Sequence, residues 1–474
     1  MTPALLTRSA LSKPSGAGRR RPPRLRGIPR VVAALGGGAA LAAIGLAASP
    51  GLGVGAIVAV LVAAVALTWR GVTALVRRRR RRQVPVARGP GRRATPLGVA
   101  IVEIAAIVVT AIAGVSWAQA MRQPSNSTLG IRTVEWVRDH GGAGLVSEVE
   151  RVYYSFTAPA KGGPSLLTLP AVGVAPARGG SRAGGAHTAS RRHTPHRLPV
   201  VRPPRVRPII QPGLPGEGVW TVTQARFARA PQPPLLVAAY RPTPDYPRVV
   251  AGLAWFNHRR TAISLYPGLR EPPGGAARGA AAQVPAGPRG RLLATFNSGF
   301  KHKDSGGGFF AQGRLLEPMV AGQGTIVGMK NGRMDVRAWH GGARPGPGVA
   351  FARQNLPLIV EHGRPNPNLS DGPQWGATLG NAVLVWRSGV GVDRHGNLLY
   401  AAGPSLGVAG LARILIHAGA VRAVELDINS YWVTLNTYGS TGAQDAHPLL
   451  PAMQRSAQRY LTPDDRDFFA VYAR

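Results

Sequence analysis

Short apolar runs separated by proline and glycine fill the second half of the chain, and they constrain its fold more than any other feature. The runs Val219 to Val222, Leu235 to Tyr240 and Thr261 to Leu265 are bounded by Pro/Gly turns. Apolar runs of this length between turn residues are typical of β-strands. One helix is clearly indicated, from Gly410 to Gly419, where apolar residues recur at helical spacing. The mixture predicts an α+β domain, rich in β-strands, over residues 217–474.

The first third of the chain contains three long apolar runs. Val31 to Ser49 and Gly53 to Trp69 are nearly free of charge, and Leu97 to Trp117 has about the length that crosses a bilayer. Arginine clusters precede the first run and separate the second from the third. By the positive-inside rule these clusters are cytoplasmic. We therefore expect a basic cytoplasmic tail at 1–30 and three transmembrane helices within 31–120.

This pattern predicts a multi-pass protein of the cytoplasmic membrane, with the lipid bilayer as a partner and the C-terminal domain extracytoplasmic. A cleaved signal peptide is the alternative for the first run, and a buried core helix is the alternative for the third run, Leu97 to Trp117. Residues 121–156 have the patterning of a juxtamembrane helical hairpin. Residues 157–216 are rich in Pro, Gly and Arg and predict a linker. The expected fold class is an α+β extracytoplasmic domain rich in β-strands, preceded by a membrane-spanning α-helical region.

The net charge of +38 raises the question of nucleic-acid binding. Only 27 basic and 15 acidic residues follow from Glu217 on, so most of the excess precedes the domain. No base-reading motif accompanies the charge, and we expect no nucleic-acid partner. Cysteine is absent, which excludes disulfides, thiolate metal sites and cysteine nucleophiles.

Two carboxylates, Glu425 and Asp427, lie two residues apart in an apolar segment that follows the predicted helix. On a regular strand their side chains share one face, with Cα atoms about 6.6 Å apart. Charges in such a segment need partners or a chemical role, so the pair is the first candidate for catalysis. An edge strand with both acids facing water is the alternative. A divalent cation shared by the pair also stays open, although no ligand spacing requires one, and no cofactor is certain.

A second cluster combines glycines with cations. An apolar strand leads into Asn297-Ser298-Gly299, and Lys301, His302 and Asp304 follow before three further glycines. Glycines allow backbone amides to approach an anion closely, and neighbouring cations favour phosphate. The spacing of a P-loop is missing, and a glycine-rich hairpin loop is the alternative.

Arg387 marks a third cluster. It lies on an apolar strand that runs into a turn at His395-Gly396-Asn397 and returns as a second strand. Its guanidinium is a candidate for a bidentate clamp on phosphate or carboxylate. An exposed strand arginine is the alternative.

The order of these clusters resembles that of the phosphodiester glycosidase family. The matching segments, within about 290–440, are Asn297-Ser298-Gly299-Phe300, Arg387-Ser388-Gly389-Val390-Gly391 and Glu425-Leu426-Asp427-Ile428-Asn429-Ser430. The family's counterparts are an Asn-Gly-Gly-Phe-like strand end, an Arg-Thr/Ala-Ala-Ile-Gly-like strand and Asn-Leu-Asp-Gly-Gly-Gly-Ser. Two departures stand out: Glu425 replaces the family's Asn, and residues 428–430 replace its glycine triplet.

The resemblance implies a hydrolase that cleaves a sugar-1-phosphodiester in cell-envelope glycans, with a phosphodiester-linked glycan or sugar phosphate as its partner. Asp427 is then the principal catalytic carboxylate, Glu425 its partner or replacement acid, and Arg387 the phosphate clamp. The other substrate-binding candidates are Asn297, Lys301, His302 and Asn429. The alternative is a non-catalytic carbohydrate or cell-wall binding module on the same fold, favoured because Ile428 cannot supply the positive φ that glycine permits.

Overall fold

The computed structural model describes residues 96–173, 202–274, 282–370, 372–376, 384–439 and 441–474. Contacts between residues divide the chain into a unit of residues 1–94 and a unit of residues 95–474, and every described residue belongs to the second. The predicted basic tail and the first two apolar runs therefore lie outside the described residues. So does the middle of the predicted linker, residues 174–201.

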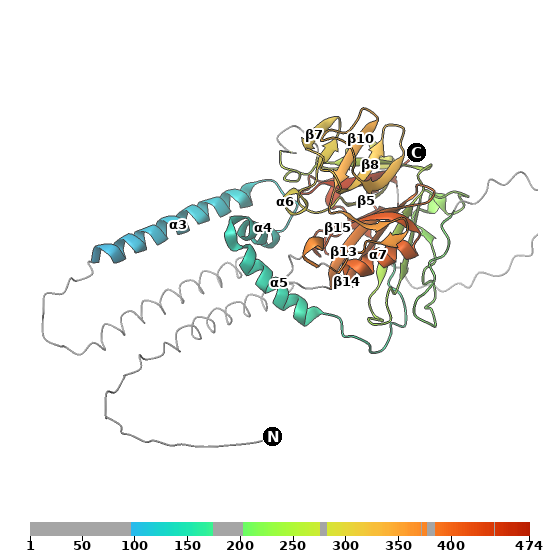
Figure 1. Cartoon of the computed structure of the whole chain (residues 1–474), viewed down its shortest axis with the longest axis horizontal. Helices are drawn as coiled ribbons and strands as arrows, with labels where there is room; N and C mark the ends of the chain where they lie inside the picture. Colours follow the sequence, from blue (N-terminus) through green and yellow to red (C-terminus); the bar gives the residue numbers. More distant parts are fainter. Residues whose placement is uncertain (1–95, 174–201, 275–281, 371, 377–383, 440) are drawn as a thin grey trace, which may run out of the picture. The chain divides into compact units, whose positions relative to one another are not determined.

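Helices are few in the described part of the chain (Figure 1). The α-helices are α3 (Pro96–Arg122), α4 (Leu129–Val137), α5 (Ala143–Thr157), α6 (His302–Ser305) and α7 (Val408–His417). A π-helical turn, Arg138–Gly142, joins α4 to α5. The single-turn 3-10 helices are Ala225–Phe227, Gly287–Arg291, Gly372–Trp375, Thr441–Ala443 and Arg459–Leu461.

Among the residues that the structure describes, no helix combines the length and the apolarity needed to cross a membrane. The third predicted span, Leu97 to Trp117, falls within α3. Trp117, at the end of that run, packs against the protein, because its Nε1 donates a hydrogen bond to the Thr133 hydroxyl of α4 at 3.1 Å. For the described residues this finding overturns the predicted membrane-spanning helical region, and with it the predicted multi-pass membrane location. The other two predicted spans lie outside the described residues.

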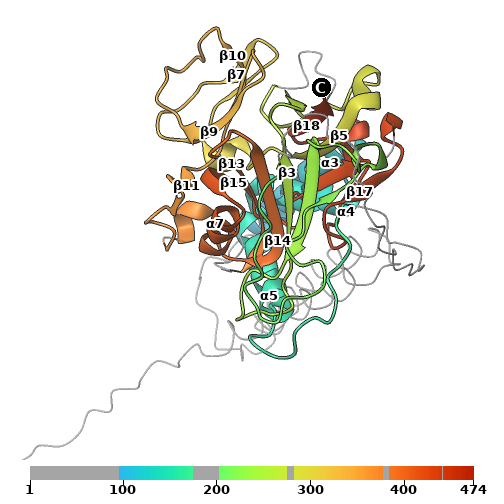
Figure 2. The ribbon, with the colours of Figure 1, turned by 90° about the vertical axis from the view of Figure 1, so that its right-hand side faces the viewer.

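The strands of the described chain form three antiparallel sheets. The largest has the order β1-β2-β3-β14-β13-β15-β11-β12. Its strands are, in that order, Thr221–Val222, Leu235–Tyr240, Ala251–Phe256, Leu398–Leu406, Val385–Asp393, Ala420–Asp427, Leu358–Glu361 and Arg364–Pro365. Figure 2 shows β3, β14, β13 and β15 side by side, with α7 beside them.

The two smaller sheets have five strands each. One, β7-β6-β10-β8-β9, consists of Arg314–Glu317, Phe309–Ala311, Val349–Gln354, Gly324–Met329 and Met334–Ala338. The other, β17-β16-β5-β18-β4, consists of Ala446–Pro448, Leu435–Tyr438, Leu292–Asn297, Phe468–Ala473 and Thr261–Tyr266. The described protein is thus mostly β-sheet, and the α+β prediction was wrong, because α7 is the one helix of more than a single turn between β1 and β18.

The main core lies between the sheets. Phe296 of β5 stacks on Phe469 of β18 with ring centroids 5.0 Å apart, and it meets Tyr400 of β14 at 5.5 Å. Leu411 and Leu415 of α7 lie in a second core cluster, with residues of β2, β3, β14 and β15. The central strands β13 and β15 are therefore buried on both sides, which explains why the sequence of β15 reads as an apolar run.

The helix, turn and strand predicted around the acid pair are confirmed. α7 ends at His417, and Gly419 turns the chain into β15 with φ +105°. A positive φ of this size favours glycine. The turn directs β15 along β13, with Val392 opposite Arg422 near its start and Ser388 opposite Asp427 at its end.

Two segments that precede residue 217 pack onto the sheets. The hydroxyls of Ser125 and Ser127 both donate to Oδ2 of Asp465, at 2.5 and 3.0 Å. Further along, Leu166, Leu169 and Val172 pack against the main core. The folded unit therefore includes residues that lie well before the first strand.

Candidate functional site

A pocket of about 290 Å³ opens at the C-terminal end of β15. Six parts of the chain meet there: α4 with the turn after it, the loop after β5, the loop after β10, the segment between β12 and β13, the loop after β15 and the segment before β18. The lining residues are Glu135, Arg138, Phe300, Lys301, Asp304, Leu356, Gln374, Gly376, Asp427, Ile428, Asn429, Trp432 and Arg466.

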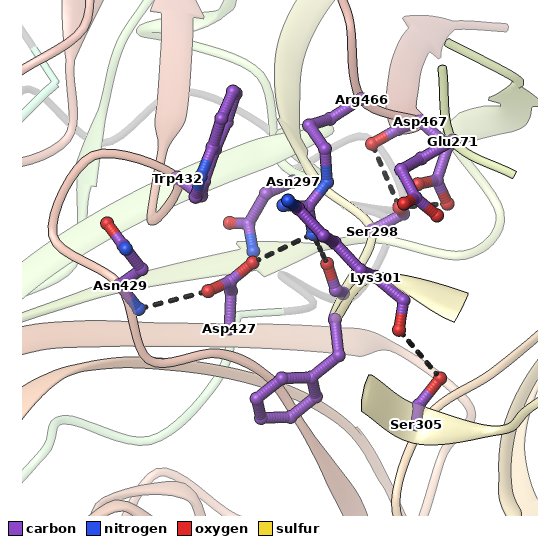
Figure 3. A network of polar contacts seen from close by, with 12 residues as sticks. Glu271, Asn297, Ser298, Lys301, Ser305, Asp427, Asn429, Trp432, Arg466 and Asp467 are labelled. Carbon is purple, nitrogen blue, oxygen red and sulfur yellow. Dashed lines mark hydrogen bonds and ion pairs between the residues drawn. The ribbon is translucent and has the colours of Figure 1, made fainter. Parts of the chain in front are cut away.

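Asp427 is the last residue of β15 and is 4% exposed. Its Oδ2 accepts a hydrogen bond from Nη2 of Arg466 at 3.1 Å, and its Oδ1 accepts one from the backbone N–H of Asn429 at 3.0 Å (Figure 3). Burial raises the pKa of Asp427, and the positive charge of Arg466 opposes this, leaving the pKa above its usual value. The carboxyl group is therefore poised to exchange a proton closer to neutral pH than an ordinary aspartate.

Arg466 connects three parts of the site. Besides binding Asp427, its Nη2 donates to the carbonyl of Gly299 at 2.7 Å, and its guanidinium lies 5.0 Å from the ring centroid of Trp432. The Asp427 carboxylate raises the pKa of Arg466 against the effect of burial. Arg466 and Trp432 were not predicted from the sequence. The signal for Arg466 was the charged run Asp464-Asp465-Arg466-Asp467 directly before an apolar strand.

The three acids of that charged run bind other groups, which leaves Arg466 to Asp427. Asp464 pairs with Arg459 at 2.8 Å, Asp465 with Arg270 at 3.4 Å, and Asp467 with Arg353 at 2.6 Å. Burial would raise the pKa of Asp464, but Arg459 holds it below its usual value.

Glu425 and Arg387 lie outside the pocket lining and bind each other. Oε1 of Glu425 is 2.6 Å from Nη1 of Arg387, and both side chains are buried. Arg387 also donates to the carbonyls of Leu406 and Trp375, at 2.8 and 3.2 Å. Burial raises the pKa of Glu425, although Arg387 opposes this.

A β-bulge explains why the two acids of β15 have different surroundings. Ser388 of β13 lies opposite Asp427, but the next residue, Gly389, lies opposite Glu425. The extra residue on β15 is Leu426. It interrupts the regular alternation on which the predicted shared face of Glu425 and Asp427 depended. Asp427 therefore reaches the pocket, while Glu425 meets Arg387.

Asn297, the last residue of β5, is buried behind the site. Its Nδ2 donates to the Ser388 hydroxyl, and its Oδ1 accepts from the Tyr400 hydroxyl and the Thr434 N–H, each at 3.1 Å. Ser388 in turn donates to the backbone carbonyl of Asp427 at 3.3 Å. Asn297 thus ties the ends of several strands together near Asp427 and is not among the residues lining the pocket.

The remaining candidates divide between the pocket and its surroundings. Lys301 and Asn429 line the pocket, and Oδ1 of Asn429 accepts a hydrogen bond from the Tyr431 N–H at 2.9 Å. His302 does not line it: its Nδ1 lies 2.9 Å from the Gly307 carbonyl and its Nε2 lies 3.4 Å from Glu317. Asp427, Lys301 and Asn429 therefore meet at the pocket, whereas Glu425, Arg387, Asn297 and His302 lie around it.

Helix α4 and the π-helical turn after it contribute two charged residues that were not predicted from the sequence. Glu135 forms an ion pair with Lys301, and Arg138 pairs with Glu150 at 2.6 Å. Burial would raise the pKa of Glu135, but Lys301 lowers it below its usual value. The pocket cations Lys301, Arg138 and Arg466 each already bind a carboxylate.

Within the described ranges, no group of three or more His, Asp or Glu side chains is placed to hold a metal ion.

Comparisons with known proteins give distant likenesses. No family model matches the chain, and no curated protein matches it. Among solved structures, it is similar to the zebrafish N-acetylglucosamine-1-phosphodiester alpha-N-acetylglucosaminidase catalytic domain auto-inhibited by its pro-peptide, at 15% identity and a TM-score of 0.37, over 54% of this chain and 87% of that one. A hypothetical protein from Synechocystis matches at 15% identity and a TM-score of 0.30, over 48% and 59%. A putative exported protein from Burkholderia pseudomallei matches at 12% and 0.28, over 48% and 75%.

Proposed function

We propose that this protein is a hydrolase that cleaves a sugar-1-phosphodiester, with Asp427 as the reacting carboxylate. The observation that carries the proposal is the buried Asp427 carboxyl, held by Arg466 at the wall of a pocket that Lys301 and Asn429 also line. Asp427 is also the residue at which the order of sequence motifs matches the family's aspartate. Its raised pKa suits a group that gives or takes a proton.

The reaction breaks the bond between the anomeric carbon and the phosphate oxygen. Water supplies the hydroxyl that remains on the sugar, and its other proton balances the phosphate that leaves. Asp427 can activate the water or stabilise the positive charge that develops at the anomeric carbon. In this proposal Arg466 and Lys301 hold the phosphate, because both cations line the pocket, whereas Arg387 binds Glu425.

Access for an anionic substrate depends on α4 in this proposal. Lys301 can bind phosphate only after it gives up Glu135, since a cation paired with a carboxylate attracts a further anion weakly. Glu135 is the natural group to be displaced, because it lies on a helix separate from the sheets that hold Asp427 and Arg466.

A non-catalytic carbohydrate-binding module remains the second candidate, and Ile428 favours it. The Ile428 side chain packs with Phe300 and Val385, where a glycine triplet would leave open space. Gly376 lies so close that a Cβ there would meet Cδ1 of Ile428 at 2.7 Å. The wall of the pocket after Asp427 is therefore bulky, which suits retention of a sugar as well as its hydrolysis.

The test is release of free sugar from a panel of sugar-1-phosphodiesters by the full chain. Asp427→Asn should lower turnover by a factor of about 100 or more, as loss of a proton-transfer group does. Asp245→Asn, which alters an exposed acid far along the sequence, should leave turnover unchanged. Equal turnover in wild type and Asp427→Asn would contradict the proposal. Sugar-phosphate binding without turnover would identify the binding module.

A further inference from the structure

A groove of about 500 Å³ lies at the other end of β13 and β15, away from Asp427. Three turns border it: the turn between β8 and β9, the turn between β13 and β14, and the turn between β3 and β4, which carries His258. Arg422, near the start of β15, completes the border. Asp427 lies five residues further along the same strand, so the groove begins about 17 Å from the reacting carboxylate.

The groove has an apolar floor. Val327 and Val392 are buried beneath it, and Met329 and Met334 are partly buried beside them. Such a floor suits the ring carbons of a sugar better than it suits a bare ion.

Unpaired arginines surround that floor. The lining contains Arg333, Arg337, Arg394 and Arg422 against two acids, Asp335 and Asp393. Asp335 is occupied by Arg422 at 2.5 Å. Within the described chain, the other three arginines have no carboxylate partner.

Asp393 forms no ion pair with these arginines, because its carboxylate closes its own turn, and the lining still holds four arginines against two carboxylates. Its Oδ1 accepts hydrogen bonds from the N–H groups of His395 and Asn397, at 2.8 and 2.9 Å, and its Oδ2 accepts one from Nδ2 of Asn397 at 2.9 Å. The groove therefore has uncompensated positive charge, whereas the cations of the pocket at Asp427 are each paired. An anion is the ligand that this charge favours.

We propose that the groove is a remote subsite that binds a second phosphate-bearing segment of the same substrate, which is a linear glycan with repeated phosphodiesters. This inference rests on the proposed function. Single contacts to exposed arginines contribute little, so useful affinity requires one ligand that presents several negative charges at once. Phe, Tyr and Trp are missing from the lining residues, although single-stranded nucleic acids bind chiefly by stacking on such rings. A phosphate-bearing glycan therefore fits better.

The test compares chain lengths on the full-length protein. The substrates are synthetic oligomers of two and of eight sugar-1-phosphate units with the same reacting end. For Arg333→Gln with Arg394→Gln, KM for the eight-unit substrate should rise roughly tenfold at low salt, while KM for the two-unit substrate and both kcat values stay unchanged. The matched control is Arg344→Gln with Arg364→Gln, two exposed arginines outside the groove, which should change nothing. An equal rise for both lengths, or no rise, would overturn the subsite.

A binding measurement separates this inference from the proposed function. Calorimetric titration of the eight-unit oligomer into Asp427→Asn should give binding that weakens about tenfold when the two groove substitutions are added. Weakened binding without wild-type turnover would retain the groove and reject the hydrolase. Tighter binding of a single-stranded DNA oligomer of equal charge would reject the glycan as the ligand.

Discussion

Arg387 and Glu425 neutralise each other inside the protein, with Nη1 and Oε1 2.6 Å apart and side chains 6% and 0% exposed. The two residues lie 38 positions apart in the sequence, on the neighbouring strands β13 and β15. A buried ion pair of this kind tolerates the loss of one partner poorly, because the remaining charge is left without compensation. The pair therefore links the integrity of β13 and β15 to the shape of the site at their ends.

Arg387→Gln should destabilise the protein by about 3 to 5 kcal/mol, because it leaves Glu425 buried and unpaired. The double variant Arg387→Met with Glu425→Gln should recover much of this loss. Denaturant unfolding of both variants measures the effect. A stable Arg387→Gln protein without activity would instead support the phosphate-clamp role inferred from the sequence.

Arg466→Gln should move the midpoint of the pH profile of turnover, where Asp427 titrates, to higher pH. Arg466 lowers the pKa of Asp427, which burial has raised, so its removal leaves the carboxyl protonated over a wider range. The raised pKa of Asp427 also affects the free energy of unfolding. The contribution of Asp427 to stability should fall as pH rises from the usual aspartate range through its folded-state pKa. Turnover against pH checks the shift, with Arg466→Lys as the charge-retaining control. If the midpoint of the pH profile does not move in Arg466→Gln, the titrating group is not Asp427.

Glu135→Gln should strengthen the binding of an anionic substrate, because it releases Lys301. We expect KM to fall roughly threefold to tenfold, the range for loss of one partly buried ion pair. Asp139→Asn is the matched control, since Asp139 pairs with Lys303 on the same part of the chain but does not line the pocket. The same fall in both variants would point to a general loosening of α4.

The ion pair of Glu135 also predicts a dependence on acid. Lys301 holds the pKa of Glu135 below its usual value, so the pair stabilises the docked helix above the ordinary glutamate range. This contribution should be lost as pH falls through the lowered pKa. Hydrogen exchange of α4 amides at decreasing pH would detect the release, and Glu135→Gln should remove the pH dependence.

Gly299→Ala should disrupt the site. Gly299 has φ +149°, and a Cβ there would meet Oδ1 of Asn355 at 1.9 Å. The clash would displace the Gly299 carbonyl, which accepts from Arg466. We expect a loss of about 2 kcal/mol or more in the free energy of unfolding. Gly287→Ala is the control, because nothing lies within 4 Å of its Cβ position. Equal stability of the two variants would contradict this account.

Local patterns located the helix and the strand around the acid pair. Period-two alternation and a helix ending near Gly419 correctly located β15 and α7, and the motif order pointed to Asp427. The β-bulge opposite Gly389 was not visible in one strand's sequence, since it depends on how two strands pair. The shared face of Glu425 and Asp427 was therefore inferred in error.

The missing parts of the site depend on contacts between distant segments. Arg466 reaches Asp427 across 39 positions, and Lys301 meets Glu135 across 166. The spacing of apolar residues within one helix or strand does not indicate such pairings. The hydrogen bond from Trp117 of α3 to Thr133 of α4 is a further contact of this kind.

The position of β18 between β4 and β5 has a consequence for how this protein forms its site. The residues with which β18 pairs lie roughly 170 to 210 positions earlier in the sequence, and such non-local pairings form late and slowly. Arg466 lies two residues before β18, so its ion pair with Asp427 forms only when this strand inserts between β4 and β5. During refolding from denaturant, no molecule should become active before its sheets are complete. Recovery of function should therefore follow the slowest phase of folding and show no earlier partial return.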